Sequence, residues 1–199
     1  YNKKYNLNKL QISNIDKENL ECAIACCLQL NVSPKLIVKS LKKMQSPPGR
    51  SETINLKKIS SKIIIDYAHT PDALQNILKA NTFRNNKPSL VFGCGGNRDK
   101  GKRKVMGKIA FELARKVIVT DDNPRNEKPQ IIRSEILKYC PKALEIPNRK
   151  EAIAEAIKNL EKNSILIIAG KGHEKIQILK HKTIPFDDVK IIKKILQKY

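Results

Sequence analysis

A glycine-rich, cationic loop is the part of this sequence best suited to chemistry. The stretch over 91–103 reads VFGCGGNRDKGKR, so an apolar run leads straight into the loop. Its glycines permit positive φ and close approach of a ligand to the backbone. Its cations are Arg98, Lys100, Lys102 and Arg103. A helix expected over 104–115 would aim its dipole at the same place, so the loop predicts an anion site, or else only a tight connection.

Three more apolar runs end in polar residues that a folded core does not need. They read IIIDYAHTPD over 63–72, VIVTDDNPR over 117–125 and ILIIAGKGHE over 165–174. In an open parallel sheet, ligands bind beyond the carboxyl ends of the strands. We therefore expect one crevice, built from Asp66, Arg98, Asn123, Arg125, Gly170 and Glu174.

The elements that must position these loops alternate between strand and helix. Strands are expected near 53–58, 62–66, 89–93, 116–120 and 164–168. Helices are expected near 71–80, 104–115, 128–138 and 148–161. A strand pair at 175–185 and a helix at 187–198 would close the chain. This alternation predicts a doubly wound α/β domain with a mostly parallel sheet.

The first fifty residues follow a different pattern. Helices are expected over 19–30 and 34–44, and Ser33 followed by Pro34 is a typical helix start. Prolines and a glycine over 45–50 indicate a linker. We expect Cys22 and Cys26, four residues apart in the first helix, to pack in a core rather than bind a metal.

The chain has 40 Lys and Arg residues against 19 Asp and Glu residues, a formal net charge of +21. Such a charge suits nucleic acid or an anionic membrane surface. The cations are dispersed along the chain, however, and only 9 residues are Phe or Tyr, with no Trp to stack on bases. We therefore expect a solvated lysine-rich surface and neither nucleic acid nor membrane as a partner. A basic nucleic-acid-binding module stays open as an alternative.

The 5 cysteines show no C-x-x-C spacing. Reduced thiols in a cytoplasmic protein are the simplest explanation, and no metal ligand set is expected. No apolar run approaches the length of about 20 residues that a membrane span needs, and no signal peptide opens the chain.

Four motifs in order resemble the carboxyl-terminal part of the Mur ligases, the ATP-dependent enzymes that build the peptidoglycan stem peptide. They are DYAHTPDAL at 66–74, FGCGGNRDKGKR at 92–103, TDDNPR at 120–125 and AGKGHE at 169–174. The resemblance runs from about Asn19 to the end of the chain, and we assign no site to residues 1–18. It implies a Rossmann-like fold, a cytoplasmic location and a monomer.

The resemblance also implies parts that these residues do not contain. Mur ligases carry a P-loop in a central domain and hold a UDP group with an amino-terminal domain. No G-x-x-x-x-G-K-[ST] sequence occurs in the 199 residues. We therefore expect a fragment, in which residues 1–46 end the central ATP-binding domain and residues 47–199 form the carboxyl-terminal, amino-acid-binding domain.

On the nucleotide side, the resemblance places Asp66 at the ATP ribose, His69 beside the nucleotide and Arg50 at an ATP phosphate. It gives Lys100 a role in activity near the phosphates, and we group His69 with it as catalytic. The alternatives are ordinary: a histidine is often a structural hydrogen bonder, and Arg50 could be a plain linker cation. ATP and Mg²⁺ would be held mainly by the central domain.

On the amino-acid side, the resemblance matches Arg98 to the arginine that contacts the substrate carboxylate. Asn97 stands in this loop where the family commonly has Asp. The resemblance assigns Gly170 and Glu174 to the distal ammonium group of the substrate, Gly170 through its backbone. Lys171 and His173 lie between them and could instead anchor the loop.

The DNPR sequence resembles the form of the family that selects meso-diaminopimelate over L-lysine. Arg125 can pair bidentately with the distal carboxylate, which lysine lacks, while Asp122 and Asn123 line the same place. Lysine would leave that arginine unpaired, at a cost of about 1 to 3 kcal/mol. The alternative is that Asp-Asn-Pro forms a simple turn after a strand.

As a mechanism, the resemblance implies that ATP activates the carboxylate of UDP-N-acetylmuramoyl-L-alanyl-D-glutamate as an acyl phosphate, which the amine of meso-diaminopimelate attacks. We expect the chain alone to be inactive. A lysine-adding or dipeptide-adding ligase stays open as an alternative, since either would need different chemistry at 122–125.

Overall fold

The computed structural model describes residues 14–44, 47–84 and 86–198. The chain divides into two compact units, Tyr1–Ser46 and Pro47–Tyr199. In the described part, no helix combines the length and the apolar composition that a bilayer crossing requires.

The first unit holds two helices, α1 (Asn14–Gln29) and α2 (Pro34–Leu41). Ser33 caps α2 by accepting a hydrogen bond from the Leu36 amide at 3.4 Å, as its sequence predicts. The predicted bounds shift: α1 begins at Asn14 rather than 19, and α2 ends at Leu41 rather than 44. Linker positions 45 and 46 lie outside the described residues.

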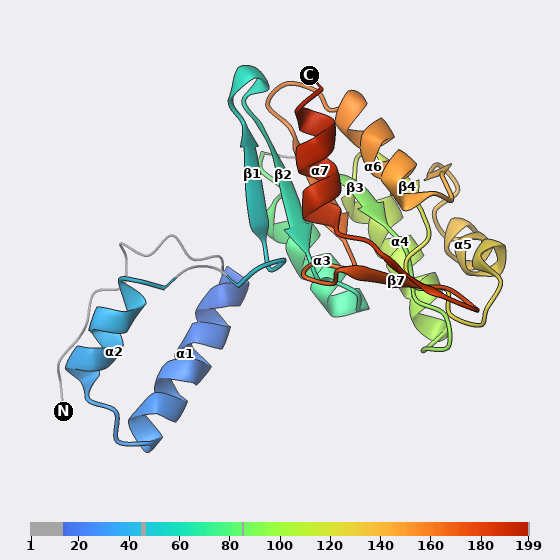
Figure 1. Cartoon of the computed structure of the whole chain (residues 1–199). Helices are drawn as coiled ribbons and strands as arrows, with labels where there is room; N and C mark the ends of the chain where they lie inside the picture. The colour runs from blue at the N-terminus through green and yellow to red at the C-terminus, as the bar shows by residue number, and fades with distance from the viewer. Residues whose placement is uncertain (1–13, 45–46, 85, 199) are drawn as a thin grey trace. The chain divides into compact units, whose positions relative to one another are not determined.

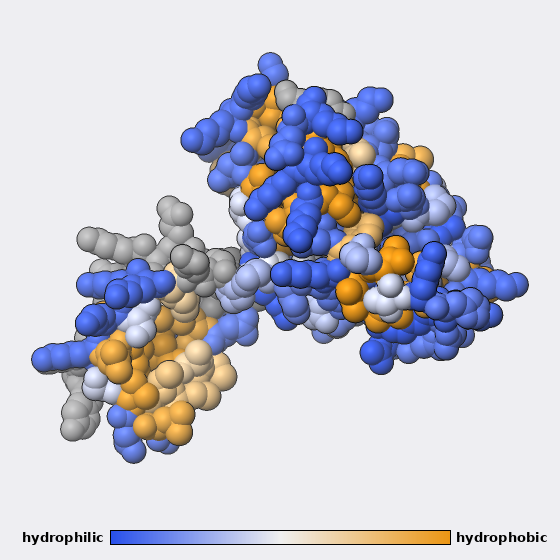
Figure 2. All heavy atoms as spheres, in the orientation of Figure 1, coloured by the Kyte–Doolittle hydropathy of each residue, from blue (hydrophilic) through white to orange (hydrophobic). Residues whose placement is uncertain are grey.

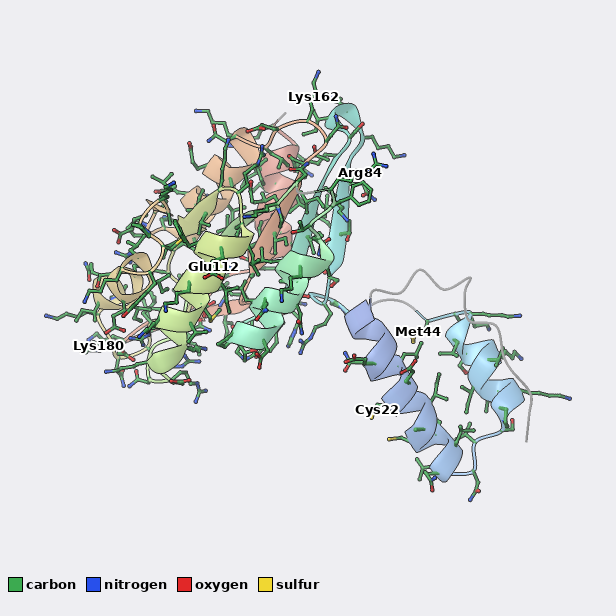
Figure 3. The ribbon with its side chains drawn as sticks, turned by 180° about the vertical axis from the view of Figure 1, so that it is seen from behind. Cys22, Met44, Arg84, Glu112, Lys162 and Lys180 are labelled. Atoms are coloured by element: carbon green, nitrogen blue, oxygen red, sulfur yellow. The ribbon has the colours of Figure 1, made fainter. Side chains whose placement is uncertain are left out.

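The predicted core position of Cys22 and Cys26 is wrong, because both side chains are exposed. Cys22 points away from α1 in Figure 3. Two helices are too few to enclose a core, so large apolar side chains of this unit also stay exposed. They are Leu28, Leu30, Leu36 and Met44. Figure 2 shows apolar side chains gathered on one face of this helix pair.

The second unit is built on a six-stranded sheet (Figure 1). Its strands are β1 (Glu52–Leu56), β2 (Ser61–Asp66), β3 (Ser89–Phe92), β4 (Val117–Val119), β5 (Leu144–Glu145) and β6 (Ile165–Ala169). The order across the sheet is β1-β2-β6-β3-β4-β5, with only β1 antiparallel to its neighbour. The predicted doubly wound, mostly parallel sheet is confirmed.

Helices cover both faces of this sheet. They are α3 (Pro71–Ala80), α4 (Gly101–Leu113), α5 (Pro129–Leu137), α6 (Arg149–Lys158) and α7 (Asp188–Leu196). One core cluster packs α3, α4 and α5 on one face, and a second packs α6 and α7 on the other. Side chains along β2 point alternately to the two faces of the sheet. Ile64 therefore packs in the first cluster, and Ile63 and Ile65 pack in the second.

The predicted elements of this unit differ from the observed ones mainly at their ends. Helix α4 starts at Gly101, three residues before its predicted start, so the glycine-rich loop is shorter than the sequence suggested. A 3-10 turn over Lys57–Ile59 replaces the end of the first predicted strand. Strand β5 was not predicted, because two residues are too short to show alternation. The closing pair is the hairpin β7 (Ile176–Ile178) and β8 (Thr183–Pro185).

Candidate functional site

All four motif loops leave the same edge of the sheet. They follow the carboxyl ends of β2, β6, β3 and β4, which are neighbours in that order and run parallel. Strand β2 ends at Asp66 and β6 at Ala169, and these two residues pair across the sheet. The predicted crevice edge is therefore a single row of four loops.

Close backbone contact joins the glycine-rich loop to the DNPR loop. The Gly96 amide donates to the Asn123 carbonyl at 2.9 Å. A methyl group on Gly96 would lie 2.0 Å from the Pro124 carbonyl oxygen, and one on Gly93 would lie 2.2 Å from that of Thr120. Glycine is required at both positions because any side chain would push the two loops apart.

Arg98 and Arg125 both lie beside Gly95. A methyl group there would come 2.8 Å from Arg125 Nη1 and 3.9 Å from Arg98 Cγ, so the two arginines share one side of the loop. Arg125 Nη1 donates to the carbonyl oxygens of Gly96 at 3.0 Å and Asn123 at 3.3 Å. Its Nε and Nη2 make no hydrogen bond with described residues, which leaves one edge of the guanidinium for a bidentate carboxylate.

Asn123, Lys171 and Glu174 form a polar network beside these arginines. The side-chain amide of Asn123 donates to Glu174 Oε2 at 2.9 Å. The ammonium of Lys171, fully buried, donates to Asn123 Oδ1 at 3.0 Å and to Glu174 Oε2 at 3.2 Å. Glu174 keeps part of its carboxylate accessible, because its side chain is 29% exposed. Lys171 therefore anchors its loop, the alternative role that its place between Gly170 and Glu174 left open.

Asp122 and Gly170 are structural neighbours at the base of this network. Asp122 Oδ1 accepts from the backbone amide of Asn123 at 2.7 Å. The Asp122 backbone carbonyl accepts from Gln177 Nε2 at 2.7 Å. Gly170 has φ +112°, and a methyl group on it would lie 2.9 Å from Asp122 Oδ2. Its amide donates to the Asp66 carbonyl at 3.1 Å. Only glycine can hold this strained turn beside a buried carboxylate.

A second group of side chains surrounds Tyr67. The Arg50 guanidinium lies over its ring at 4.7 Å, and the rings of His69 and His173 lie 4.5 Å and 4.9 Å from it. His69 Nδ1 is 2.8 Å from the Tyr67 carbonyl oxygen. Sequence reasoning missed Tyr67, although its place between Asp66 and His69 was a usable signal.

The Asp66 carboxylate is held by backbone amides. It accepts from the Ser51 amide at 2.7 Å and from the Ala68 amide at 2.8 Å. Asp66 thus fixes the turn that presents Tyr67 and His69. Gly172 joins this turn to the other group of loops, because a methyl group on it would lie 2.8 Å from Tyr67 Cβ.

One of the four cations predicted to line the glycine-rich loop points into the core instead. Arg103 is fully buried and pairs with Glu127 at 3.0 Å and Glu135 at 2.7 Å, so it braces α4 rather than facing a ligand. Lys102 donates to the His69 carbonyl at 2.9 Å. The side chain of Lys100, next to α4, makes no hydrogen bond or ion pair with a described residue. Asn97 has φ 51° and accepts from the Asn126 amide at 2.9 Å, which suits asparagine.

A buried ion pair supports the same edge, and no motif pointed to it. Arg149, at the start of α6, donates to both carboxylate oxygens of Asp188 at 2.9 and 2.7 Å, and to the Ala169 carbonyl at 3.0 Å. Burial disfavours its charge, but nearby carboxylates, chiefly Asp188, together outweigh burial and raise the pKa of Arg149. Arg149 Nη1 has no partner although it is buried.

Burial is the main cause of the pKa shifts of two titratable groups near the loops. Burial raises the pKa of the Cys94 thiol to about 12, and its Sγ lies 3.8 Å from Met106 Sδ. Burial also raises the pKa of Asp121, against the opposing effect of Arg133, to which it is hydrogen-bonded. Among the described residues, no group of three or more His, Cys, Asp or Glu side chains could hold a metal ion.

Known proteins share much of this sequence and this fold. The profile of the family described as "Mur ligase, glutamate ligase domain" matches residues 49–172. The UDP-N-acetylmuramoyl-L-alanyl-D-glutamate--2,6-diaminopimelate ligase of Rickettsia rickettsii is 43% identical over 201 residues, which cover 98% of this chain and 41% of that protein. The ligase of the same name from Clostridium tetani is 42% identical over 179 residues, covering 88% of this chain and 37% of that protein.

A solved structure of a ligase with this name superposes on the chain with a TM-score of 0.70. The two are 34% identical, and the match covers 94% of this chain and 39% of the other. The chain therefore spans less than half the length of these relatives.

Proposed function

This chain belongs to the Mur ligase family, and we propose that it is the carboxyl-terminal part of the ligase that adds meso-diaminopimelate to UDP-N-acetylmuramoyl-L-alanyl-D-glutamate. We propose that residues 1–46 end the central ATP-binding domain and that residues 47–199 form the amino-acid-binding domain. ATP-dependent chemistry and five free cysteines are consistent with a location in the cytoplasm.

The placement of Arg98 and Arg125 beside Gly95 carries the substrate assignment. Meso-diaminopimelate has two carboxylates, so two arginines beside one glycine suit it, whereas L-lysine would leave one of them unpaired. We assign Arg98 to the proximal carboxylate. We assign Arg125, with its free Nε and Nη2 edge, to the distal one.

The ammonium group beside the distal carboxylate would be held by Glu174. Lys171 and Asn123 already occupy Glu174 Oε2, and Oε1 makes no hydrogen bond with a described residue. We assign the Gly170 backbone and the buried residues Asp122 and Asn123 to the shape of this pocket end. The opposite amine of the substrate would stay free for reaction.

The group around Tyr67 would hold part of ATP. Arg50 supplies a cation for phosphate, and Tyr67 and His69 supply ring faces for stacking. Asp66 would meet the ribose, although both of its oxygens already accept backbone hydrogen bonds. We give Lys100 and His69 the catalytic roles on this side, with Lys100 as a positive charge near the transferred phosphate and His69 beside the nucleotide. Mg²⁺ is assigned no ligand in this chain.

In the proposed reaction, the amine of meso-diaminopimelate attacks an acyl phosphate on the nucleotide-linked substrate, an amide bond forms and phosphate leaves. This chain contributes by holding the amino acid so that its amine faces that carbonyl carbon. Without a P-loop, the 199 residues alone should neither hydrolyse ATP nor form the amide bond.

Calorimetric titration of the 199-residue chain with meso-diaminopimelate and with L-lysine tests the substrate assignment. We expect meso-diaminopimelate to bind at least about tenfold more tightly. Arg125→Ala should abolish the preference, and Arg125→Lys should restore only part of it, because lysine lacks the planar fork. Arg115→Ala, an exposed arginine just before β4 and away from the motif loops, is the matched control. Equal binding of L-lysine would disprove the diaminopimelate assignment and leave the family assignment standing.

In the complete enzyme, Arg125→Ala should raise the KM for meso-diaminopimelate by about ten- to a thousandfold. Asp66→Ala should weaken ATP binding and leave the amino-acid preference unchanged. This contrast separates the two halves of the proposed site.

A further inference from the structure

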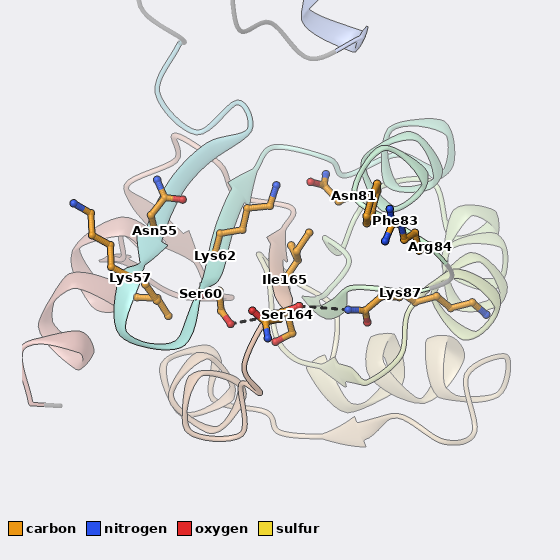
Figure 4. A pocket seen from close by; sticks show the side chains of 14 residues that line it. Asn55, Lys57, Ser60, Lys62, Asn81, Phe83, Arg84, Lys87, Ser164 and Ile165 are labelled. Atoms are coloured by element: carbon orange, nitrogen blue, oxygen red, sulfur yellow. Dashed lines mark hydrogen bonds between the residues drawn. The ribbon is translucent and has the colours of Figure 1, made fainter.

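A cavity of about 550 Å³ lies at the edge of the sheet opposite the four motif loops. It is lined by the β1–β2 turn, the amino ends of β2 and β6, and the turn after α3 (Figure 4). A five-residue strand spans about 16 Å, so the cavity is separate from the crevice. Arg84 of this cavity lies far from Lys180 of the β7–β8 turn in Figure 3.

The cavity carries positive charge without acidic neighbours. Its lining includes four Lys or Arg residues and no Asp or Glu. Three of them, Lys57, Lys62 and Arg84, make no ion pair with a described residue. The fourth, Lys87, donates to the Glu112 carbonyl at 2.7 Å, and its side chain extends away from the cavity in Figure 4. Figure 4 shows that the Lys57 side chain also points away from the cavity, so Lys62 and Arg84 are the two cations without an ion pair beside it, and they favour an anion.

An exposed aromatic ring forms one wall of the same cavity. Phe83 is 69% exposed, which is unusual for so large an apolar side chain. The Arg84 guanidinium lies 5.2 Å from its ring centre, so charge and ring face stand side by side. Leu56 and Ile165 add further apolar surface to the lining. The hollow therefore offers a surface for a ring and cations for its substituents.

We propose that this cavity binds a small aromatic anion that carries two negative charges. Its ring would pack against Phe83 and Ile165, while Lys62 and Arg84 pair with its charged groups. Two carboxylates on a ring and one phosphate ester of a ring share this chemistry. The site is independent of the substrate assignment, because it shares no residue with the motif loops.

Isotope-edited NMR of the 199-residue chain provides a test that locates binding by residue. The probes are isophthalate and phenyl phosphate, with glutarate as a dianion without a ring and benzamide as a ring without charge. We expect both aromatic dianions to shift the backbone amides of Leu56, Ser60 and Arg84. We expect glutarate and benzamide to bind at least about fivefold more weakly, because each lacks one of the two interactions. The relative affinities of the two aromatic dianions identify the preferred anionic group.

Single variants separate the two interactions. Lys62→Ala and Arg84→Ala should each weaken isophthalate binding by about tenfold, and Phe83→Ala should weaken isophthalate but not glutarate. The charge-matched control is Lys193→Ala on α7, which should change nothing. Unchanged thermal unfolding excludes misfolding. Shifts confined to Gly95–Asn97, equal binding of glutarate, or equal losses in the α7 control would overturn the proposal.

Discussion

The side-chain amide of Asn123 donates to the Glu174 carboxylate at 2.9 Å, across 51 residues of sequence. The DNPR loop and the loop after β6 are thus joined through one carboxylate oxygen, which also accepts from Lys171 at 3.2 Å. A buried ammonium supplies the positive charge that keeps Glu174 in place. The position of Glu174 therefore depends on both Asn123 and Lys171.

Lys171→Met should destabilise the chain by about 1 to 3 kcal/mol, because it leaves the oxygens of Asn123 and Glu174 without their shared donor. Urea unfolding monitored by circular dichroism measures this change. Lys175→Met is the matched control, since that lysine is exposed and should stay within about 0.5 kcal/mol of the parent chain. Equal effects of the two substitutions would contradict a structural role for the Lys171 ammonium.

Asp188→Asn should lower the free energy of unfolding by about 3 to 5 kcal/mol, because Arg149 would be left charged and buried without its carboxylate. The double substitution Arg149→Met with Asp188→Leu should recover much of that loss, since an apolar pair needs no desolvation of charge. Urea unfolding of both variants gives the comparison. A double variant less stable than Asp188→Asn would show that the pair does more than neutralise its own charges.

Gly96→Ala should cost about 1 to 3 kcal/mol, because the new methyl group would collide with the Pro124 carbonyl at 2.0 Å. Gly101→Ala is the control: its methyl group would have only Asp99 Oδ1 nearby, at 3.2 Å, at the first residue of α4. That change should be neutral within about 0.5 kcal/mol. Thermal unfolding of the two variants decides the prediction, which fails if Gly96→Ala is tolerated equally.

Thiol labelling should distinguish the cysteines by position. At pH 8, Cys22 and Cys26 should react rapidly with iodoacetamide because both are exposed, whereas Cys94 should stay unmodified. The thiolate is the reacting form, and with a pKa of about 12 the folded chain presents almost none of it at Cys94 below pH 10. Mass spectrometry after timed quenching reports each site. In urea all five should react, and rapid labelling of Cys94 in the folded chain would refute its burial.

The fold could be predicted from the sequence because the signals were local and repeated. Apolar runs such as 63–65 and 165–169 alternate with helical patterns, and starts such as Thr70-Pro71 combine a capping side chain with a proline. The helix ends were less predictable. Gly101 begins α4 because Asp99 accepts its amide at 2.8 Å, a contact that no propensity reveals.

The arrangement within the candidate site was only partly predictable. Topology alone brings Arg98, Arg125 and Glu174 to one edge, because parallel strands end together. Whether a cation of the glycine-rich loop is buried or exposed depends on tertiary contacts. Arg103 turned inward to Glu127 and Glu135, partners that lie in a later loop and helix, whereas Arg98 stayed exposed.

The pairing of Arg149 with Asp188 affects the order in which parts of the protein fold during translation. All six strands of the sheet precede Asp188, so the sheet can assemble before that carboxylate leaves the ribosome. Until then the Arg149 guanidinium cannot be buried under the end of β6. A premature stop codon after β8 would thus yield a polypeptide with all six strands of the sheet but without the carboxylate that pairs with Arg149 beneath the motif loops.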